Sequence, residues 1–263
     1  EPEPFEEGEH LVAASAKVAL LDRLLLRLRR RGDRVLLYSG STQMLDILQD
    51  VLTMRRLPYV RLDGSARAEE RFAAIADFRR GGVGDGGDAM PPPFCFLLST
   101  RAGGVGLNLV EANTVIFFDP DWNPMVERQA AGRAHRLGQS RPVTVFHLFC
   151  RDTVEEVIRR RCARKASFAD GLLREHSAEA DGADPTGREA AEAIQFGVHE
   201  LCAANPDSDA SVGDDELDAI LSRIGSEESA AKAAEAVAAG ADATDESVYV
   251  FEGQNLSGFE RGA

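Results

Sequence analysis

Short, continuous apolar runs alternate with amphipathic stretches along most of this sequence. Strands that are apolar without alternation are buried on both faces, which requires a parallel sheet covered by helices on both sides. The runs that predict strands are 34–38, 59–62, 94–99, 114–118 and 143–149. The helical spacing of apolar residues predicts helices at Ser15–Arg31, Thr42–Arg56, Arg67–Arg80, Met125–Arg136 and Asp152–Phe168. The predicted fold class is therefore α/β.

Charge is divided unequally along the chain. The formal net charge of −14 would, taken alone, argue against a DNA-binding surface. Residues 1–170 carry 25 basic and 23 acidic residues, whereas residues 171–263 carry 5 and 21. The later part is rich in Ala, Asp, Glu, Ser and Gly and poor in aromatics, which is typical of weak order. We expect an acidic opening segment at 1–10, a folded domain at 11–170 and an acidic, helical or disordered linker at 171–263.

The sequence gives several indications of compartment. The longest apolar run is far short of the roughly 18 residues that a membrane span needs, and no charged-then-apolar leader precedes the first helix. The four cysteines lie far apart without a C-x-x-C pair, so a reducing compartment is the simplest interpretation. The first residue is Glu1 rather than Met, which favours a piece of a longer protein.

The loops after the predicted strands carry the candidate chemistry, because function in such folds gathers at the carboxyl ends of the strands. The loop Ser99–Asn108 holds three glycines that allow a phosphate or nucleic-acid backbone to approach closely. A tight strand-to-helix turn is an equally weighted alternative. It is not a Walker A loop, because G-x-x-x-x-G-K-[ST] occurs nowhere in the chain.

Two further loops stand out. Arg133 and Arg136 are three residues apart and would share one face of a helix. Paired guanidinium groups suit a triphosphate, although a solvated basic face is the commoner meaning of an isolated R-x-x-R. The loop DPDWNP contains the only tryptophan, Trp122. That residue is either a packing anchor or an exposed recognition residue, and the sequence favours neither.

Taken in order, five motifs resemble the second RecA-like lobe of a SWI/SNF-type chromatin-remodelling ATPase. The order of five motifs makes the resemblance highly specific, and it covers roughly residues 10–170. The segment RDTVEEVIRRRCARK (151–165) is similar to the brace helix that follows this lobe. The five motifs are VLLYS (35–39), RLDGS (61–65), LLSTRAGGVGLNL (97–109), VIFFDPDWNP (115–124) and QAAGRAHRLGQ (129–139).

The resemblance implies a role for particular residues. Arg133 and Arg136 would be arginine fingers that reach the ATP phosphates. Gly104 and Gly106 would line the nucleotide cleft, with Gln129 beside it. The residues that would face the DNA backbone are Ser39, Gly64, Ser65, Ser99, Thr100, Arg101, Asn108 and Trp122. Phosphate contacts carry no sequence information, so DNA binding would be salt-sensitive and sequence-independent.

The activity that the resemblance implies is that of a C-terminal motor lobe in an ATP-dependent DNA translocase that remodels nucleosomes in the nucleus. Its partners would be DNA, nucleosomes and an upstream RecA-like lobe, with ATP and Mg²⁺ as cofactors. The upstream lobe would carry the Walker A lysine and the DExH acid pair that holds Mg²⁺. Because both are missing here, this chain alone is expected not to hydrolyse ATP.

Other interpretations stay open. A repair translocase of the same superfamily, or a non-catalytic nucleic-acid-binding or histone-binding module, would explain many of the same features. The branch of the family that the chain resembles most also implies a C-terminal macrodomain and poly-ADP-ribose as partners. Two departures from the family pattern are Gly40, where a glutamine is common, and a long Gly/Pro-rich loop at 81–93.

The acidic segment has short apolar periodicity at 191–201 and 215–224, and 229–240 is rich in alanine. Each of the first two would form a short helix docked on the lobe, although a solvated linker is the simpler interpretation. The acidic residues near Asp207–Asp218 suggest a regulatory element that docks on a basic surface. Arginines of the lobe or histone tails would provide that surface.

Overall fold

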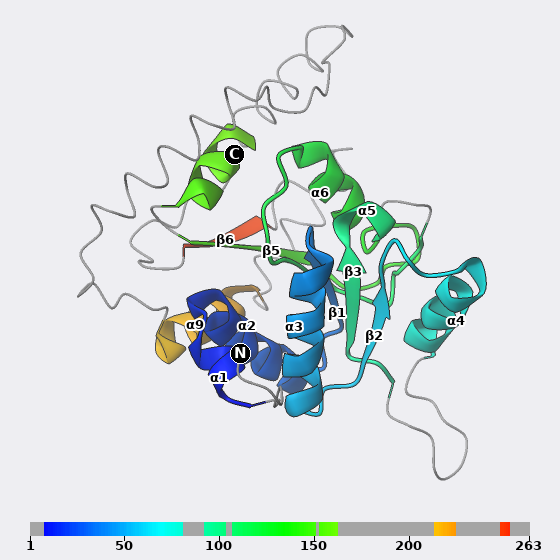
Figure 1. The fold of residues 1–263 in the computed structure, drawn as a ribbon, viewed down its shortest axis with the longest axis horizontal. Coiled ribbons are helices and arrows are strands. Elements are labelled where there is room, and N and C mark those ends of the chain that lie inside the picture. The colour runs from blue at the N-terminus through cyan, green and yellow to red at the C-terminus, as the bar shows by residue number, and fades with distance from the viewer. Residues whose placement is uncertain are drawn as a thin grey trace, which may run out of the picture.

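A parallel sheet forms the centre of the computed structural model (Figure 1). The structure describes residues 8–80, 92–103, 107–150, 153–162, 213–224 and 248–252. The strands are β1 (Val35–Ser39), β2 (Tyr59–Leu62), β3 (Cys95–Ser99), β4 (Thr114–Phe117), β5 (Thr144–Phe149) and β6 (Val248–Glu252). Their order is β2-β3-β1-β4-β5-β6, and every neighbouring pair is parallel. The five predicted strands and the predicted fold class are confirmed.

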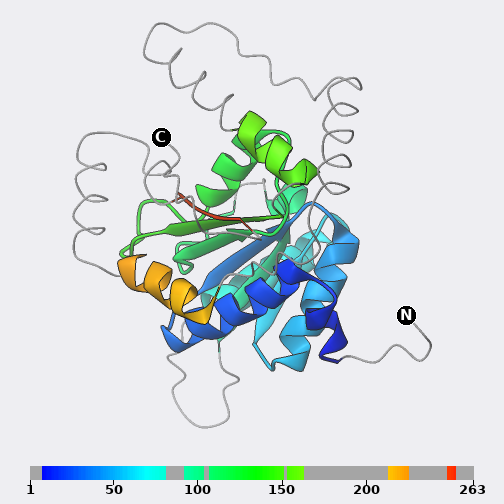
Figure 2. The ribbon, with the colours of Figure 1, turned by 90° about the vertical axis from the view of Figure 1, so that its left-hand side faces the viewer.

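Helices cover both faces of this sheet (Figure 2). They are α1 (His10–Ala13), α2 (Ala16–Arg30), α3 (Thr42–Met54), α4 (Ala68–Arg79), α5 (Thr100–Gly103), α6 (Pro124–Ala131), the helix at 154–162 and α9 (Asp214–Ile224). Among the helices in the described ranges, none combines the length and apolarity that crossing a membrane demands.

The strands are buried on both faces because successive side chains enter two different apolar clusters. On β1, Val35 and Leu37 pack with the leucines of α2 and α3, whereas Leu36 and Tyr38 pack with α4 and α6. All five residues of β1 and of β3 are buried. This two-sided burial explains why the sequence shows continuous apolar runs rather than alternation.

Side-chain caps set where several of the helices begin. The hydroxyl of Ser15 accepts a hydrogen bond from the amide of Val18 at 3.4 Å, and Ser41 does the same for Met44 at 3.3 Å. Asn123 caps α6, whose first residue is Pro124. These caps fix the start of each helix near the carboxyl ends of the strands, where the candidate loops lie.

The helix predicted at Met125–Arg136 is wrong at its carboxyl end. Helix α6 stops at Ala131, with Gly132 as its C-cap, and the chain continues as a series of turns. Glycine is a poor helix former, and Gly138 adopts a φ of 103°, which other residues rarely tolerate. The predicted shared helical face of Arg133 and Arg136 is therefore absent.

One predicted helix of the acidic segment is present and docked on the lobe. Helix α9 buries Leu217, Ile220 and Leu221 in the same cluster as the leucines of α2. Arg27 of α2 binds Asp218 at 2.5 Å between Nε and Oδ1. Docking on lobe arginines is therefore observed, and the simpler interpretation of a solvated linker is wrong for these residues.

Strand β6 was not predicted. It pairs in parallel with β5, from Val145 opposite Val248 to Phe149 opposite Glu252. Its apolar run was assigned to the acidic linker because the surrounding composition is polar. The helix predicted at 191–201, the alanine-rich stretch 229–240 and residues 81–91 of the Gly/Pro-rich loop lie outside the described residues, as does the predicted helix beyond residue 162.

Candidate functional site at the carboxyl edge of the sheet

The carboxyl ends of four neighbouring strands meet at one edge of the sheet. Ser39 at the end of β1 is directly opposite Ser99 at the end of β3. Leu62, the last residue of β2, is opposite Leu98, and Phe117, the last of β4, is opposite Tyr38. The loops that follow these strands therefore gather at the same edge. This geometry brings together Ser39, Ser99 and the starts of the loops that follow β2 and β4.

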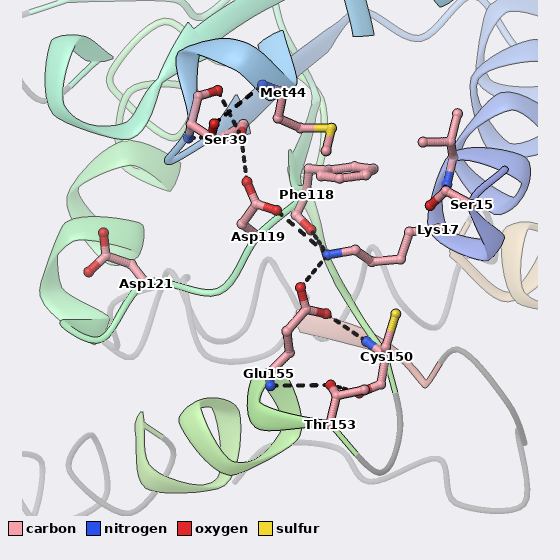
Figure 3. Close-up of polar contacts among 12 residues, drawn as sticks. Ser15, Lys17, Ser39, Met44, Phe118, Asp119, Asp121, Cys150, Thr153 and Glu155 are labelled. Carbon is pink, nitrogen blue, oxygen red and sulfur yellow. Dashed lines mark hydrogen bonds and ion pairs between the residues drawn. The ribbon is translucent and has the colours of Figure 1, made fainter. Parts of the chain in front are cut away.

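The hydroxyl group of Ser39 is held by a carboxylate rather than exposed. Ser39 is fully buried, and its Oγ donates a hydrogen bond to Asp119 (Figure 3). The same Oγ accepts a bond from the amide of Ser41 at 3.2 Å. A serine hydroxyl has one hydrogen to donate. In this arrangement that hydrogen belongs to Asp119, so a phosphate at this edge would have to compete for it.

Ser65 repeats the same arrangement one strand away. Its Oγ donates to Asp63 at 2.5 Å, and its amide donates to the same carboxylate oxygen at 3.0 Å. Arg61 closes the group with an ion pair to Asp63 at 2.9 Å. The bonds from Ser65 and the charge of Arg61 hold the pKa of Asp63 below its ordinary value. Gly64 and Ser65 are exposed, so this turn presents its backbone to solvent.

The loop after β3 begins as a strand-to-helix turn, since α5 starts at Thr100. Ser99 and Thr100 are buried, whereas Arg101 is exposed. Asn108 is half-buried, and its carbonyl oxygen accepts a bond from Arg79 at 2.8 Å. Gly104 and Gly106, the predicted nucleotide-binding glycines, lie outside the described residues.

The Trp122 loop, residues 118–124, is fixed by contacts with α6 and with the helix at 154–162. Its Asp121 amide donates to Glu127 at 2.8 Å. The thiol of Cys162 lies 3.1 Å from the carbonyl oxygen of Asp121 and 3.5 Å from that of Trp122. Trp122 itself is half-buried. Packing thus determines the course of the loop, while part of the Trp122 residue stays open to solvent.

A buried ionisable group supports this loop. Glu127 lies 3.3 Å from Nδ1 of His147 and 3.7 Å from Arg159, measured at its Oε2. Burial alone would raise the pKa of Glu127, but His147, the Asp121 amide and Arg159 together lower it. Burial lowers the pKa of His147 below its ordinary value of 6.5, against the opposing charge of Glu127. His147 is therefore neutral at neutral pH.

The lowered pKa of His147 predicts that the lobe loses stability in mild acid. A group whose pKa is lower in the folded state binds fewer protons there, so unfolding becomes easier as pH falls below the ordinary value of 6.5 for histidine. We expect His147→Gln to flatten the dependence of unfolding free energy on pH, which for one group is at most about 1.4 kcal/mol per pH unit. Urea unfolding at several pH values between 7.5 and 5 measures this dependence. His10→Gln, on the exposed surface of α1, is the control, and equal slopes in wild type and His147→Gln would contradict the assignment.

The two arginines lie on the turns after α6. The carbonyl oxygen of Arg133 accepts a hydrogen bond from the amide of Leu109 at 3.0 Å, which joins this turn to the end of the Gly-rich loop. Arg133 also lies close enough to oppose the rise in the pKa of Tyr38 that burial causes. Arg136 is exposed, as is Gln129 on α6.

Several residues that shape this edge were not predicted. Lys17, Asp63, Asp119 and Glu127 all orient neighbouring groups. At the opposite edge of the sheet, where β4 begins, Gln139 donates its side-chain amide to the carbonyl oxygens of Val110, Ala112 and Ala134. A charged residue on an otherwise apolar helix face, as at Lys17, was the one available signal. Within the described ranges, no cluster of metal-ligating side chains is present.

Comparison with known proteins identifies the class. Residues 16–138 match the helicase conserved C-terminal domain. Over these residues the chain is similar to the helicase C-terminal lobe of chromatin-remodelling ATPases.

The relatives include a chromodomain-helicase-DNA-binding protein and a chromatin-remodelling ATPase. The chain is 48% identical over 224 residues to chromodomain-helicase-DNA-binding protein 1-like of Danio rerio, which covers 84% of this chain and 21% of that protein. It is 45% identical over 181 residues to the chromatin-remodelling ATPase INO80 of Pyricularia oryzae, covering 69% of the chain and 9% of the relative. The sequence resembles the first of these most in EPEPFEEGEHL (1–11), RLDGSARAEER (61–71) and RDTVEE (151–156). The chain spans about a fifth of that relative's length.

A solved structure supports the fold. The C-terminal part of the Fun30 ATPase domain aligns with a TM-score of 0.56 and 33% identity, covering 72% of this chain and 55% of that one.

Proposed function

We propose that this chain is the C-terminal motor lobe of an ATP-dependent DNA translocase that remodels nucleosomes. The observation that carries the proposal is the bond between Leu109 and Arg133, which links two motifs that the family resemblance assigns to the nucleotide. The arginine turn and the residue that follows the Gly-rich loop therefore lie beside each other. In this proposal a single phosphate chain would reach both motifs.

The proposed role in catalysis is electrostatic. Arg133 and Arg136 would stabilise the charge that develops on the γ-phosphoryl group during transfer, as arginine fingers do. Gly104, Gly106 and Gln129 would lie beside the nucleotide. Mg²⁺ would be held mainly by a first RecA-like lobe, which would also supply the Walker A lysine. This chain alone would therefore not turn over ATP.

The proposed role toward DNA rests on the same sheet edge. Gly64, Ser65 and Arg101 are exposed there and would meet the phosphate backbone directly. Ser39, Ser99 and Thr100 are buried, and they would support the exposed contacts rather than make them unless the edge rearranges. Trp122 is half-buried and would complete the surface. The carbonyl oxygen of Asn108 is bound by Arg79 at the end of α4, away from these groups, so Asn108 is the least supported of the proposed DNA contacts. Contacts of this kind give binding without base specificity.

DNA, nucleosomes and an upstream lobe are the proposed partners, and the nucleus is the proposed location, because the relatives are chromatin-remodelling ATPases. A macrodomain and poly-ADP-ribose are implied only by the resemblance, and the proposal does not depend on them. A repair translocase differs in showing no response to nucleosomes. A non-catalytic module differs in hydrolysing no ATP even beside an upstream lobe.

The DNA-facing role predicts a dependence on salt. In a protein that joins this lobe to its upstream lobe, Arg101→Ala is expected to weaken duplex binding equally for different sequences and to reduce the slope of log affinity against log salt by about 1. Fluorescence anisotropy with two unrelated duplexes measures it. Arg80→Ala is the matched control, because Arg80 is exposed after α4 at the opposite edge of the sheet. Equal slopes for the two variants would exclude Arg101 from the interface.

A further inference from the structure

The ammonium group of Lys17 is buried among acceptors at the functional edge. The Lys17 side chain is 9% exposed, and its Nζ donates to the carbonyl oxygen of Phe118 at 2.8 Å and to Glu155 at 2.6 Å. It also pairs with Asp119 at 3.6 Å (Figure 3). Burying an unpaired ammonium is costly, so this number of partners is what allows the charge to remain there.

Lys17 and its partners belong to three separate parts of the chain. Lys17 lies in the first turn of α2, Phe118 and Asp119 follow β4, and Glu155 belongs to the helix at 154–162. Glu155 also accepts a bond from the amide of Cys150 at 2.8 Å, which ties that helix to the end of β5. The ammonium of Lys17 thus connects α2, the start of the Trp122 loop and the helix at 154–162.

The helix at 154–162 contacts the same loop through one face. Glu155, Arg159 and Cys162 are spaced four and three residues apart, which places them on one side of a helix. Glu155 binds Lys17, Arg159 pairs with Glu127, and Cys162 contacts the carbonyl oxygens of the loop. The start of the loop is held by the contacts of Lys17 with Phe118 and Asp119. Its middle is held by the bond from the Asp121 amide to Glu127.

We propose that Lys17 is a positioning residue for the Trp122 loop and, through Asp119, for Ser39. Asp119 accepts the hydroxyl hydrogen of Ser39 and is balanced by Lys17. Without the cation, Asp119 and Glu155 lose their shared counter-charge, and the carbonyl of Phe118 loses its donor. The start of the loop is then released, and an uncompensated carboxylate remains at the edge that would face phosphates. Only this last consequence rests on the proposed function.

Trp122 provides a direct readout, because it is the only tryptophan of the chain. Acrylamide quenching of its fluorescence in the 263-residue chain, without DNA, reports how well the loop is shielded. We expect Lys17→Met to increase quenching, and Glu155→Gln, which removes one charge and keeps Lys17, to increase it less. Arg23→Met is the matched control on the same helix, because Arg23 binds Asp214 of α9 instead. Circular dichroism identifies any variant that fails to fold.

Unchanged quenching in folded Lys17→Met or in Glu155→Gln would overturn the proposal. A merely structural role for Lys17 would lower stability and leave Trp122 shielding equal to that of Arg23→Met at matched stability. In the double variant Lys17→Met with Asp119→Asn, removing the unbalanced carboxylate is expected to restore part of the shielding. A double variant that is no better shielded than Lys17→Met would contradict the proposed coupling to Asp119.

DNA affinity separates this proposal from the proposed function. In the protein joined to its upstream lobe, Lys17→Met is expected to weaken duplex binding roughly tenfold, the effect of losing one charge-assisted interaction. If quenching rises while DNA affinity stays the same, Lys17 positions the loop, but the loop does not face DNA. If the wild-type protein itself fails to bind DNA, the proposed function fails, and the quenching result still decides the role of Lys17.

Discussion

Replacing Arg133 with alanine, in a protein that joins this lobe to its upstream lobe, is expected to lower DNA-stimulated ATP hydrolysis by about 10³-fold or more, the range for a lost arginine finger. Arg133 is half-buried, and its backbone is anchored to Leu109, so its position is set before ATP arrives. The loss should appear in kcat, because the interaction strengthens as charge develops in the transition state. The KM for ATP should change much less.

Arg136→Ala separates the two arginines. Arg136 is exposed and lies beyond the end of α6, so its side chain has to be ordered by the opposite lobe. We expect a loss in kcat here as well. Arg30→Ala, exposed at the end of α2, is the matched control, and its rate should equal that of wild type. Steady-state kinetics with saturating DNA measure all three. A rate for Arg133→Ala within a few fold of the control would remove Arg133 from the catalytic assignment.

Leu217→Asp is expected to release α9 from the lobe. Leu217 is fully buried against the leucines of α2, and a carboxylate there would have no partner of opposite charge in the apolar cluster. The unfolding free energy should fall by about 1.5–3 kcal/mol, the value for burying a leucine. If α9 undocks while the sheet stays folded, the loss is limited to the free energy of docking. Urea unfolding measures the loss of free energy, and hydrogen exchange of the α9 amides measures the release of the helix from the lobe.

Ala219→Asp is the control for that experiment, because Ala219 is exposed on the same helix. It should leave the unfolding midpoint nearly unchanged. If Leu217→Asp is equally harmless, α9 does not dock in solution. Truncation before residue 213, in the protein joined to its upstream lobe, then tests whether docking has a regulatory effect. Unchanged ATPase activity and DNA affinity would leave α9 with a structural role alone.

Much of the fold could be predicted from sequence because the sheet is buried on both faces. Five apolar runs had no other plausible place than a covered parallel sheet, and each became a strand. The end of α6 was missed because the apolar spacing continues through Ala134, which is buried although it lies beyond the helix. Periodicity records burial, and a turn can be buried as well as a helix.

The candidate site was predictable in its location and less so in its contacts. Topology places the end of every parallel strand at one edge, so Ser39, Ser99 and Ser65 were expected there. Their hydrogen-bond partners depend on residues distant in sequence, such as Lys17 and Asp119, which are 101 and 80 positions from Phe118 and Ser39 respectively. No local pattern marks such pairs. They become visible only when the chain is folded.

The most direct test of the central claim is ATP hydrolysis by this chain alone and by the same chain joined to its upstream lobe, each with and without duplex DNA. The proposed division of labour predicts no turnover above background for the chain alone, and DNA-stimulated turnover for the joined protein. Hydrolysis by the chain alone, or a correctly folded joined protein that hydrolyses no ATP with DNA present, would contradict the claim that this lobe is one half of a DNA-dependent ATPase motor.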